Sequence, residues 1–410
     1  MSDVGGFVAA GYERVAEVMA NGATYLIAER ERRADLGRGG GAFAAYVGDE
    51  CVVDLWSGAS ASGVPWARDT RAVIMSATKG LTSLCAHVLF DRGDLDLNAP
   101  VVTYWPEFGA AGKEDTQIRH VLSHQSGAIG VPDADHILSW DGEGWSDTQA
   151  IAAVIAAAAP AWEPGTKHGY HGVTYGWLVA ELVRRISGQS LGAFFASEVA
   201  SPLDVDCQIG TPASDLATLA TVMEWSPPPT SRRSTLTTID PATWAGRSVL
   251  AGPKGHLFAD EHGTPRFADF MNSPRVLAAE IGAINATGSA RGLARVYSAL
   301  AVGEELVSRQ SVLEFSAEQV CGRDAVMKVP TRWAVGYTRE PPALIPGLPR
   351  QHGPDDAAFG HMGAGGQIGF ADPIAGVGCG FVRNHLENQA MPLMGASLVA
   401  ALYECLGSNG

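Results

Sequence analysis

Residues 76–90 read SATKGLTSLCAHVLF, and the pattern of this segment is helical. Its apolar residues recur at the spacing of one buried helix face, and Gly93 follows as a stop signal. Ser76 and Lys79 open the segment three residues apart, so the lysine amine can lie beside the serine hydroxyl. A serine becomes a nucleophile when a neighbouring base takes its proton, and a lysine can do this once burial depresses its pKa. The segment therefore predicts Ser76 as a nucleophile, at the positive end of a helix dipole, with Lys79 as its base.

Two further elements follow the pair in sequence order. Tyr170 lies on a loop just before a helix expected from about residue 174, where its hydroxyl can face a site between two lobes. Residues 360–366 read GHMGAGG and lead into an apolar strand. Glycines allow the backbone to approach a substrate closely, so an N–H donor in this segment could complete an oxyanion hole.

The remaining pattern separates strands from helices. Residues 4–20 read as an amphipathic helix, and 42–47 with 51–56 read as a hairpin. From 76 to about 200 the pattern stays helical, and 203–280 is irregular and rich in proline and glycine. A helix near 290–301 follows, and the strands return at the end of the chain before a closing helix. The ranges expected there are strands 333–338, 367–371 and 377–383 and helix 393–406.

Strands at both ends with helices between them predict an α+β fold. We expect one antiparallel sheet flanked by N- and C-terminal helices, with a mainly helical lobe inserted into it. The predicted division is an α/β lobe from residues 1–75 and 285–410 and a helical lobe from 76–284, with the active site between them.

The three elements together resemble the signature motifs of the serine β-lactamase and penicillin-binding-protein superfamily. Ser76-x-x-Lys79, Tyr170-x-Gly172 and His361-x-Gly363 match them in order, and the chain looks most similar to class C β-lactamase-like carboxylesterases, the family VIII esterases. Supporting segments, which extend the resemblance over nearly the whole chain, are YWPEF at 104–108, LSHQSG at 122–127, WEPGT at 162–166 and FADP at 370–373.

The resemblance implies roles for individual residues. Ser76 would be acylated, Lys79 and Tyr170 would share the general base and acid roles, and the backbone N–H groups of Ser76 and Ala364 would form the oxyanion hole. The expected substrate-binding residues are His361, Gly363, His124 and Gln125. No cofactor or metal is implied.

Two departures from the superfamily pattern bear on the substrate. Gly172 stands where the second motif usually has asparagine, so an amide contact to an acylamino side chain is missing. His361 stands where the third motif usually has lysine, and a neutral imidazole holds a substrate carboxylate less well than a cation does. Met362 replaces a hydroxyl residue in the same motif. These changes favour uncharged esters.

Composition limits the partners. The chain has 410 residues, 46% of them hydrophobic and 18% charged, as in a compact enzyme, and its formal net charge is −15. An acidic chain repels phosphate backbones, so we expect no nucleic acid. The most apolar window, 150–159, is far shorter than the roughly 20 residues of a membrane span. With no signal-like start and six scattered cysteines read as free thiols, we expect a cytoplasmic protein whose partner is a small-molecule ester. Nothing predicts an oligomeric state.

Other motifs have simpler interpretations. Residues 188–192 match the GxSxG nucleophile elbow, but a helix precedes Ser190, so it reads as a helix start. His120 and His124 have no third ligand nearby in sequence, which argues against zinc. A catalytic triad of His352 or His361 with Asp355 or Asp356 is an alternative. The Ser-Lys-Tyr arrangement accounts for more of the motif residues with fewer assumptions. Trp140, Trp145, Trp333 and loop 341–349 could line an apolar acyl pocket or belong to the core.

Three functions remain open at this point. The first is a serine esterase that cleaves small carboxylic esters through an acyl-enzyme at Ser76. The second is an amide-directed enzyme of the same fold, a β-lactamase, D-aminopeptidase or small-amide hydrolase, with an acyltransferase as a variant. The third is a non-catalytic binding domain, which would have no reason to keep Ser76, Lys79 and Tyr170 together.

Overall fold

The fold is described from a computed structural model. It describes residues 4–27, 30–34, 36–37, 39–224, 240, 242–249, 255–256, 259–260, 267–341, 348–386 and 393–409.

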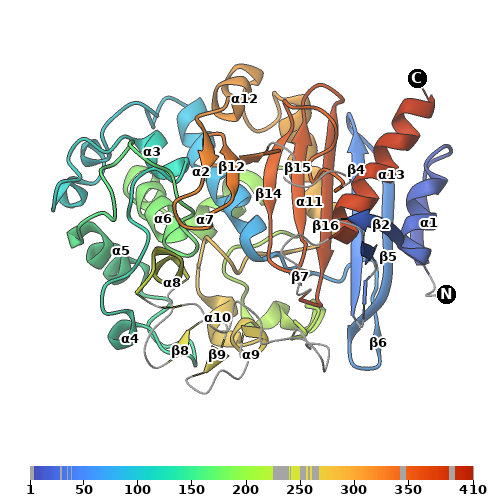
Figure 1. Ribbon diagram of the computed structural model, residues 1–410, viewed down its shortest axis with the longest axis horizontal. Helices are drawn as coiled ribbons and strands as arrows, with labels where there is room; N and C mark the ends of the chain where they lie inside the picture. Colours follow the sequence, from blue (N-terminus) through green and yellow to red (C-terminus); the bar gives the residue numbers. More distant parts are fainter. Residues whose placement is uncertain are drawn as a thin grey trace.

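One antiparallel sheet of ten strands organises the described part of the chain (Figure 1). Strands from the two ends of the sequence meet at its centre, where β4 pairs with β16. The spatial order is β1 (Val4–Val8), β5 (Glu50–Ala61), β4 (Gly40–Val47), β16 (Val377–Arg383), β15 (Ile368–Asp372), β14 (Phe359–Met362), β13 (Thr338–Arg339), β12 (Pro330–Trp333) and β11 (Val320–Arg323), with β6 (Val64–Pro65) paired to β5.

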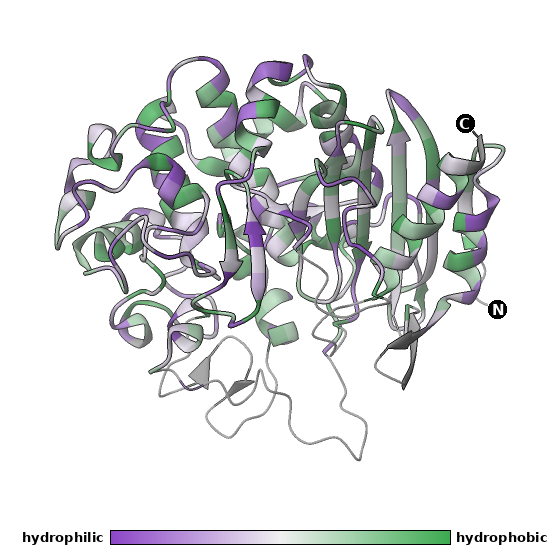
Figure 2. Ribbon diagram, turned by 45° about the horizontal axis from the view of Figure 1, so that its top comes forward, coloured by the Kyte–Doolittle hydropathy of each residue, from purple (hydrophilic) through white to green (hydrophobic). Residues whose placement is uncertain are grey.

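Helices cover both faces of this sheet. Helices α1 (Glu13–Asn21) and α13 (Leu393–Asn409) pack together beside the N- and C-termini (Figure 1). Helix α11 (Ala290–Val302) packs against β16 on the other face. Gly378 and Gly380 allow that contact, because a Cβ at either would come within 2.4 Å of the α11 backbone. In Figure 2 the strands beside α13 are mainly hydrophobic, whereas α1 carries both hydrophobic and hydrophilic residues.

The second lobe is helical and packs around α2 (Thr78–Asp91) and α6 (Thr174–Ser187). All but two residues of α2 are buried, as expected of a helix that passes through the middle of a domain. The other helices and short helical turns of this part are α3 (Ile118–Leu122), α4 (Ala134–Ile137), α5 (Thr148–Ala157), α7 (Leu191–Phe195), α8 (Trp244–Ser248), α9 (Phe267–Met271), α10 (Pro274–Ala278), α12 (Arg309–Ser316), and turns at Val101–Thr103, Pro106–Gly109, Ala196–Ala200 and Ala213–Thr218.

Short strand pairs complete the architecture. Strand β7 (Ala72–Val73) pairs with β10 (Thr287–Gly288) just before the segment that holds Ser76. The others are β2 (Ala23–Ile27) with β3 (Arg30–Ala34), and β8 (Gly255–His256) with β9 (Ala259–Asp260).

The fold class expected from the sequence is confirmed, as are the hairpin at 42–56, the helix after Ser76 and the strand at 377–383. The single helix expected over 4–20 is wrong. Its first part is strand β1, in which Val4 pairs with Ser57, and only Glu13–Asn21 is helical. The strand expected over 333–338 is likewise interrupted between β12 and β13. Pairing with the distant strand β5 decided the first case, whereas in the second the chain turns between Trp333 and Thr338, which pair with each other.

The six cysteines are all free thiols, four of them buried, with Cys51 partly exposed and Cys321 exposed. In the described ranges, no helix has both the length and the apolar character needed to cross a membrane.

Candidate active site

Ser76 lies in a single 3-10 turn, Met75–Ala77, directly ahead of α2. Met75, the residue before it, has a positive φ of 49°, which is unusual for a side chain of this size. Strained backbone of this kind is often found at functional sites. The Ser76 N–H has no hydrogen-bond partner within the described ranges.

Lys79 is fully buried with its ammonium nitrogen directed at Ser76. Its Nζ is 3.4 Å from Ser76 Oγ, 2.7 Å from the Gly172 carbonyl oxygen and 2.9 Å from that of Ala283. Burial holds the pKa of Lys79 well below its ordinary value of 10.5. No carboxylate pairs with it in the part of the chain that the structure describes. Burial therefore favours the neutral amine of Lys79 over its ammonium form.

Three oxygen atoms surround Lys79 Nζ, and in its neutral form the amine offers them two N–H donors and one lone pair. The carbonyls of Gly172 and Ala283 can only accept hydrogen bonds, so they take both N–H groups. The lone pair then faces the hydroxyl of Ser76 and can receive its proton. The geometry suits a general base.

Tyr170 covers the other side of Lys79. Its ring centroid is 4.8 Å from Lys79 Nζ, and its hydroxyl is hydrogen-bonded to Ser76. Burial raises the pKa of Tyr170, and the hydrogen bond to Ser76 opposes that effect. The backbone N–H of Tyr170 donates to Asp324 at 3.2 Å. The phenol thus stays protonated and can act as a proton donor.

Residues 361–364 approach Ser76 from β14. A Cβ on Gly363 would be 2.4 Å from the carbonyl oxygen of Ile74, so only glycine fits against the backbone that leads to Ser76. Ala364 follows, exposed, and its N–H has no partner among the described residues. Two unpaired amides, those of Ser76 and Ala364, are thus available for a developing oxyanion.

His361 is buried beside Lys79 and Tyr170. Its Nδ1 is 2.8 Å from the Met362 carbonyl oxygen, which requires the proton on Nδ1. Burial lowers the pKa of His361 to about 3, with Lys79 contributing in the same direction, so the ring is neutral near pH 7. A cation is therefore absent at this position of the third motif.

His124 and Gln125 lie on the loop after α3. The Nδ1 of His124 accepts the N–H of His171 at 3.1 Å, and its ring lies 4.2 Å from that of Trp333 and 5.2 Å from that of Tyr170. Burial holds the pKa of His124 well below its ordinary value. The Gln125 amide instead donates to Ser123. Of these two predicted substrate-binding residues, His124 packs against Tyr170, whereas the Gln125 side chain is bonded within its own loop.

The GxSxG segment and the proposed His–Asp triad do not form a catalytic arrangement in the structure. Ser190 caps α7, accepting the Ala193 N–H at 3.3 Å and donating to Glu280 at 2.8 Å, so the GxSxG match is a helix start. Neither nitrogen of His352 has a hydrogen-bond partner in the described ranges. Asp356 pairs with Arg350 instead. The triad alternative therefore has no histidine–carboxylate contact.

The tryptophans considered as pocket walls separate into two groups. Trp145 packs against Trp177 and Phe270 in the core of the helical lobe, and Trp140 contacts the same phenylalanine. Trp333 lies at the site and stacks on Tyr170. Residues 342–347 of the proposed loop fall outside the described residues.

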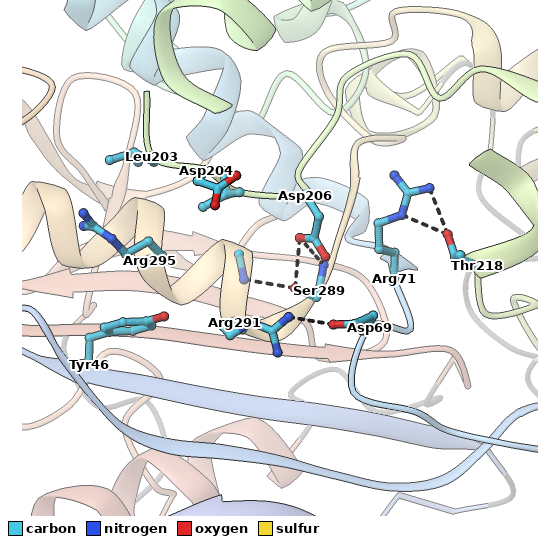
Figure 3. A pocket seen from close by; sticks show the side chains of 12 residues that line it. Tyr46, Asp69, Arg71, Leu203, Asp204, Asp206, Thr218, Ser289, Arg291 and Arg295 are labelled. Carbon is cyan, nitrogen blue, oxygen red and sulfur yellow. Dashed lines mark hydrogen bonds and ion pairs between the residues drawn. The ribbon is translucent and has the colours of Figure 1, made fainter. Parts of the chain in front are cut away.

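A separate cavity of about 450 Å³ lies beside the start of α11 (Figure 3). None of Ser76, Lys79 and Tyr170 lines it. Three arginines and three aspartates do, and Figure 3 shows Arg291 directed at Asp69, at a distance of 2.8 Å. The three arginines and three aspartates that line the cavity balance one another in charge. Its lining residues include no pair of a nucleophile and a neighbouring base.

Sequence reasoning did not single out Ala283, Asp324 or Ser248, although each forms a hydrogen bond with Lys79 or with the loop of residues 170–173, named the catalytic loop below for its proposed role. Each is a single residue 76 to 204 positions away from its partner. No spacing rule could have found them. Within the described ranges, no three His, Cys, Asp or Glu side chains lie close enough together to hold a metal ion.

Known proteins resemble this chain in sequence and in structure. The beta-lactamase family model matches residues 28–403. The esterase/beta-lactamase LipL of Mycobacterium tuberculosis is 35% identical over 366 residues, which cover 85% of this chain and 77% of LipL. The crystal structure of a family VIII carboxylesterase is 31% identical with a TM-score of 0.80, covering 98% of this chain and all of the other. A penicillin-binding protein homolog from Caulobacter crescentus is 31% identical with a TM-score of 0.79 over the same shares. The chain therefore belongs to the beta-lactamase family of hydrolases.

Proposed function

We propose that the protein is a serine esterase that hydrolyses small, uncharged carboxylic esters. The observation that carries the proposal is the buried amine of Lys79, whose two N–H groups are taken by carbonyls while its third direction faces Ser76 Oγ at 3.4 Å. LipL is named an esterase/beta-lactamase, and a carboxylesterase is among the similar structures. Both names are consistent with ester chemistry at this site.

The reaction would proceed through an acyl-enzyme. Ser76 Oγ attacks the ester carbonyl carbon as its proton moves to Lys79 Nζ, and the amides of Ser76 and Ala364 bind the oxyanion. The C–O bond to the leaving group then breaks. Tyr170 gives its phenolic proton to the departing alkoxide and regains one from the Lys79 ammonium. Water attacks the acyl-enzyme in a second cycle with the same groups in reverse roles.

The preference for uncharged esters over amides and β-lactams rests on two positions. His361 is neutral where a lysine would bind a substrate carboxylate. Gly172 leaves no amide to hold an acylamino group. Both changes remove binding for peptides and β-lactams and leave the ester-cleaving groups intact.

The test is hydrolysis of p-nitrophenyl acetate and butyrate by wild type, Ser76→Ala and Ser190→Ala. We expect the first variant to lose about 10³-fold or more in kcat and the second to stay near wild type. Ser190 is a matched control because it is the serine of the competing GxSxG motif. A chromogenic cephalosporin, assayed in parallel, should turn over far more slowly than the esters. Comparable rates on the cephalosporin would contradict the ester preference, and retained activity in Ser76→Ala would contradict the nucleophile.

A further inference from the structure

The position of the missing asparagine is already filled in this protein. A Cβ added to Gly172 would lie 2.6 Å from the carbonyl oxygen and 2.9 Å from the hydroxyl of Ser248. Any side chain at 172 would therefore collide with the backbone of a distant segment. Ser248 is the last residue of helix α8 (Trp244–Ser248), in the irregular region whose pattern had indicated no role.

Ser248 makes three hydrogen bonds to the catalytic loop. Its hydroxyl donates to the Tyr170 carbonyl at 2.6 Å and accepts the Gly172 N–H at 2.7 Å. Its own carbonyl accepts the Val173 N–H at 3.1 Å. The side chain is completely buried, so no water competes for these bonds. One residue thus holds the backbone from 170 to 173.

This segment controls the two groups that activate Ser76. The hydroxyl of Ser248 donates a hydrogen bond to the backbone carbonyl of Tyr170, and so holds the residue that carries the phenol. The carbonyl of Gly172 is the acceptor at 2.7 Å that directs an N–H of Lys79, and so directs the lone pair of that amine toward Ser76. A shift of the loop would therefore misplace the acid and the base together.

We propose that Ser248, which fills the space beside Gly172 from a different part of the chain, is a positioning residue for the reaction. It acts through the backbone of Tyr170 and Gly172 and touches no substrate. The proposal rests on the proposed catalytic roles of Ser76, Lys79 and Tyr170, but on no particular ester.

The helix that carries Ser248 also provides a matched control. Thr243 caps the start of α8, with its hydroxyl accepting the Gly246 N–H at 3.0 Å, and within the described part of the chain it forms no hydrogen bond with residues 170–173. Removing its hydroxyl weakens the same helix without touching the catalytic loop. An effect on stability alone would appear in both variants.

The experiment compares Ser248→Ala with Thr243→Ala in the full chain. Two rates are measured, kcat for p-nitrophenyl butyrate and the rate at which a fluorophosphonate modifies Ser76, followed by mass spectrometry. We expect Ser248→Ala to lower both rates by about 10- to 100-fold with KM nearly unchanged, because a small misplacement of catalytic groups costs that much. Thr243→Ala should keep both rates within about twofold of wild type.

A second pair covers the case in which Ser248→Ala does not fold. Ser248→Thr and Ser248→Val have side chains of almost the same shape and differ only in the hydroxyl. The threonine variant should be several-fold faster than the valine variant in both assays. Equal rates for these two, or a folded Ser248→Ala with wild-type rates, would overturn the positioning role.

The two proposals can fail separately. If wild type hydrolyses no ester but its Ser76 is still modified, the ester substrate is wrong, and the modification rates alone decide the role of Ser248. If Ser76→Ala keeps full ester turnover, the roles on which Ser248 depends are wrong, and this inference is overturned with them.

Discussion

The indole of Trp333 stacks on the phenol ring of Tyr170, with centroids 5.9 Å apart and ring planes only 16° from parallel. Trp333 is the last residue of β12, and its ring also lies at the edge of His124. The sheet thus supports the tyrosine from one side, while the helical lobe supplies Lys79 from the other. The stack is one direct contact between the sheet and the proposed proton donor.

This contact predicts the effect of changing the tryptophan. Trp333→Ala removes the surface on which Tyr170 rests and should lower kcat for p-nitrophenyl butyrate by about 10- to 100-fold. Trp333→Phe keeps an aromatic face and should retain most of the rate. Equal losses in the two variants would show that stacking is not what matters. Tryptophan fluorescence and thermal unfolding check that both variants are folded.

The lowered pKa of Lys79 predicts the pH dependence of the reaction. In the proposed mechanism the neutral amine is the base, so kcat/KM should fall as pH drops through that lowered pKa and should show no requirement for pH near 10.5. Lys79→Arg introduces a permanent cation that cannot lose its proton, and it should lose about 10³-fold or more in rate. A rate that rose only near the ordinary lysine pKa would contradict a neutral Lys79.

The same shift affects stability. Between the lowered pKa of Lys79 in the folded protein and 10.5 in the unfolded chain, the unfolded chain binds more protons. The free energy of unfolding should therefore decrease as pH falls through this window. Urea unfolding at pH values of about 8 and about 10 should show a smaller pH effect in Lys79→Met than in wild type. An identical pH effect in both proteins would argue against the shift.

Gly363 predicts a steric effect on the oxyanion hole. In Gly363→Ala the new Cβ would meet the Ile74 carbonyl at 2.4 Å and the Met75 side chain at 3.0 Å, which moves the Ala364 N–H away from Ser76. Losing one oxyanion donor lowers kcat by about 10²- to 10³-fold. Gly407→Ala is the matched control, because its new Cβ would meet nothing within 4 Å. Burst amplitude and kcat distinguish a slow enzyme from an unfolded fraction.

His361 predicts a change in substrate preference. His361→Lys would restore a cation where the superfamily usually has one, and a charged hydrogen bond to a substrate carboxylate favours that substrate by about 10- to 100-fold. We expect the ratio of cephalosporin to ester turnover to rise by about tenfold or more, whereas neutral His361→Gln should leave the ratio near wild type. No change in the ratio with lysine would mean that another feature sets the preference.

Part of the site could be predicted from the sequence, because some of its residues lie close together in the chain. The spacing between Ser76 and Lys79 is a helical spacing, and the structure has a 3-10 turn and a helix there. The glycines near 363 and the tyrosine before α6 could be recognised by resemblance. Gly6 shows the opposite case. It lies in a segment with helical periodicity, yet pairs with Leu55 in the sheet because β5 offers an edge.

What the sequence by itself determined is the set of proposed catalytic groups and their order, since motif chemistry depends on residue type and short spacing. Only the tertiary structure decided the state of those groups. Lys79 is deprived of water by residues from several elements, and its N–H groups are directed by carbonyls 93 and 204 positions away. The phenol of Tyr170 is supported by Trp333, and its loop is held by Ser248. Burial and long-range hydrogen bonds arise from packing between distant segments, so no local pattern records them.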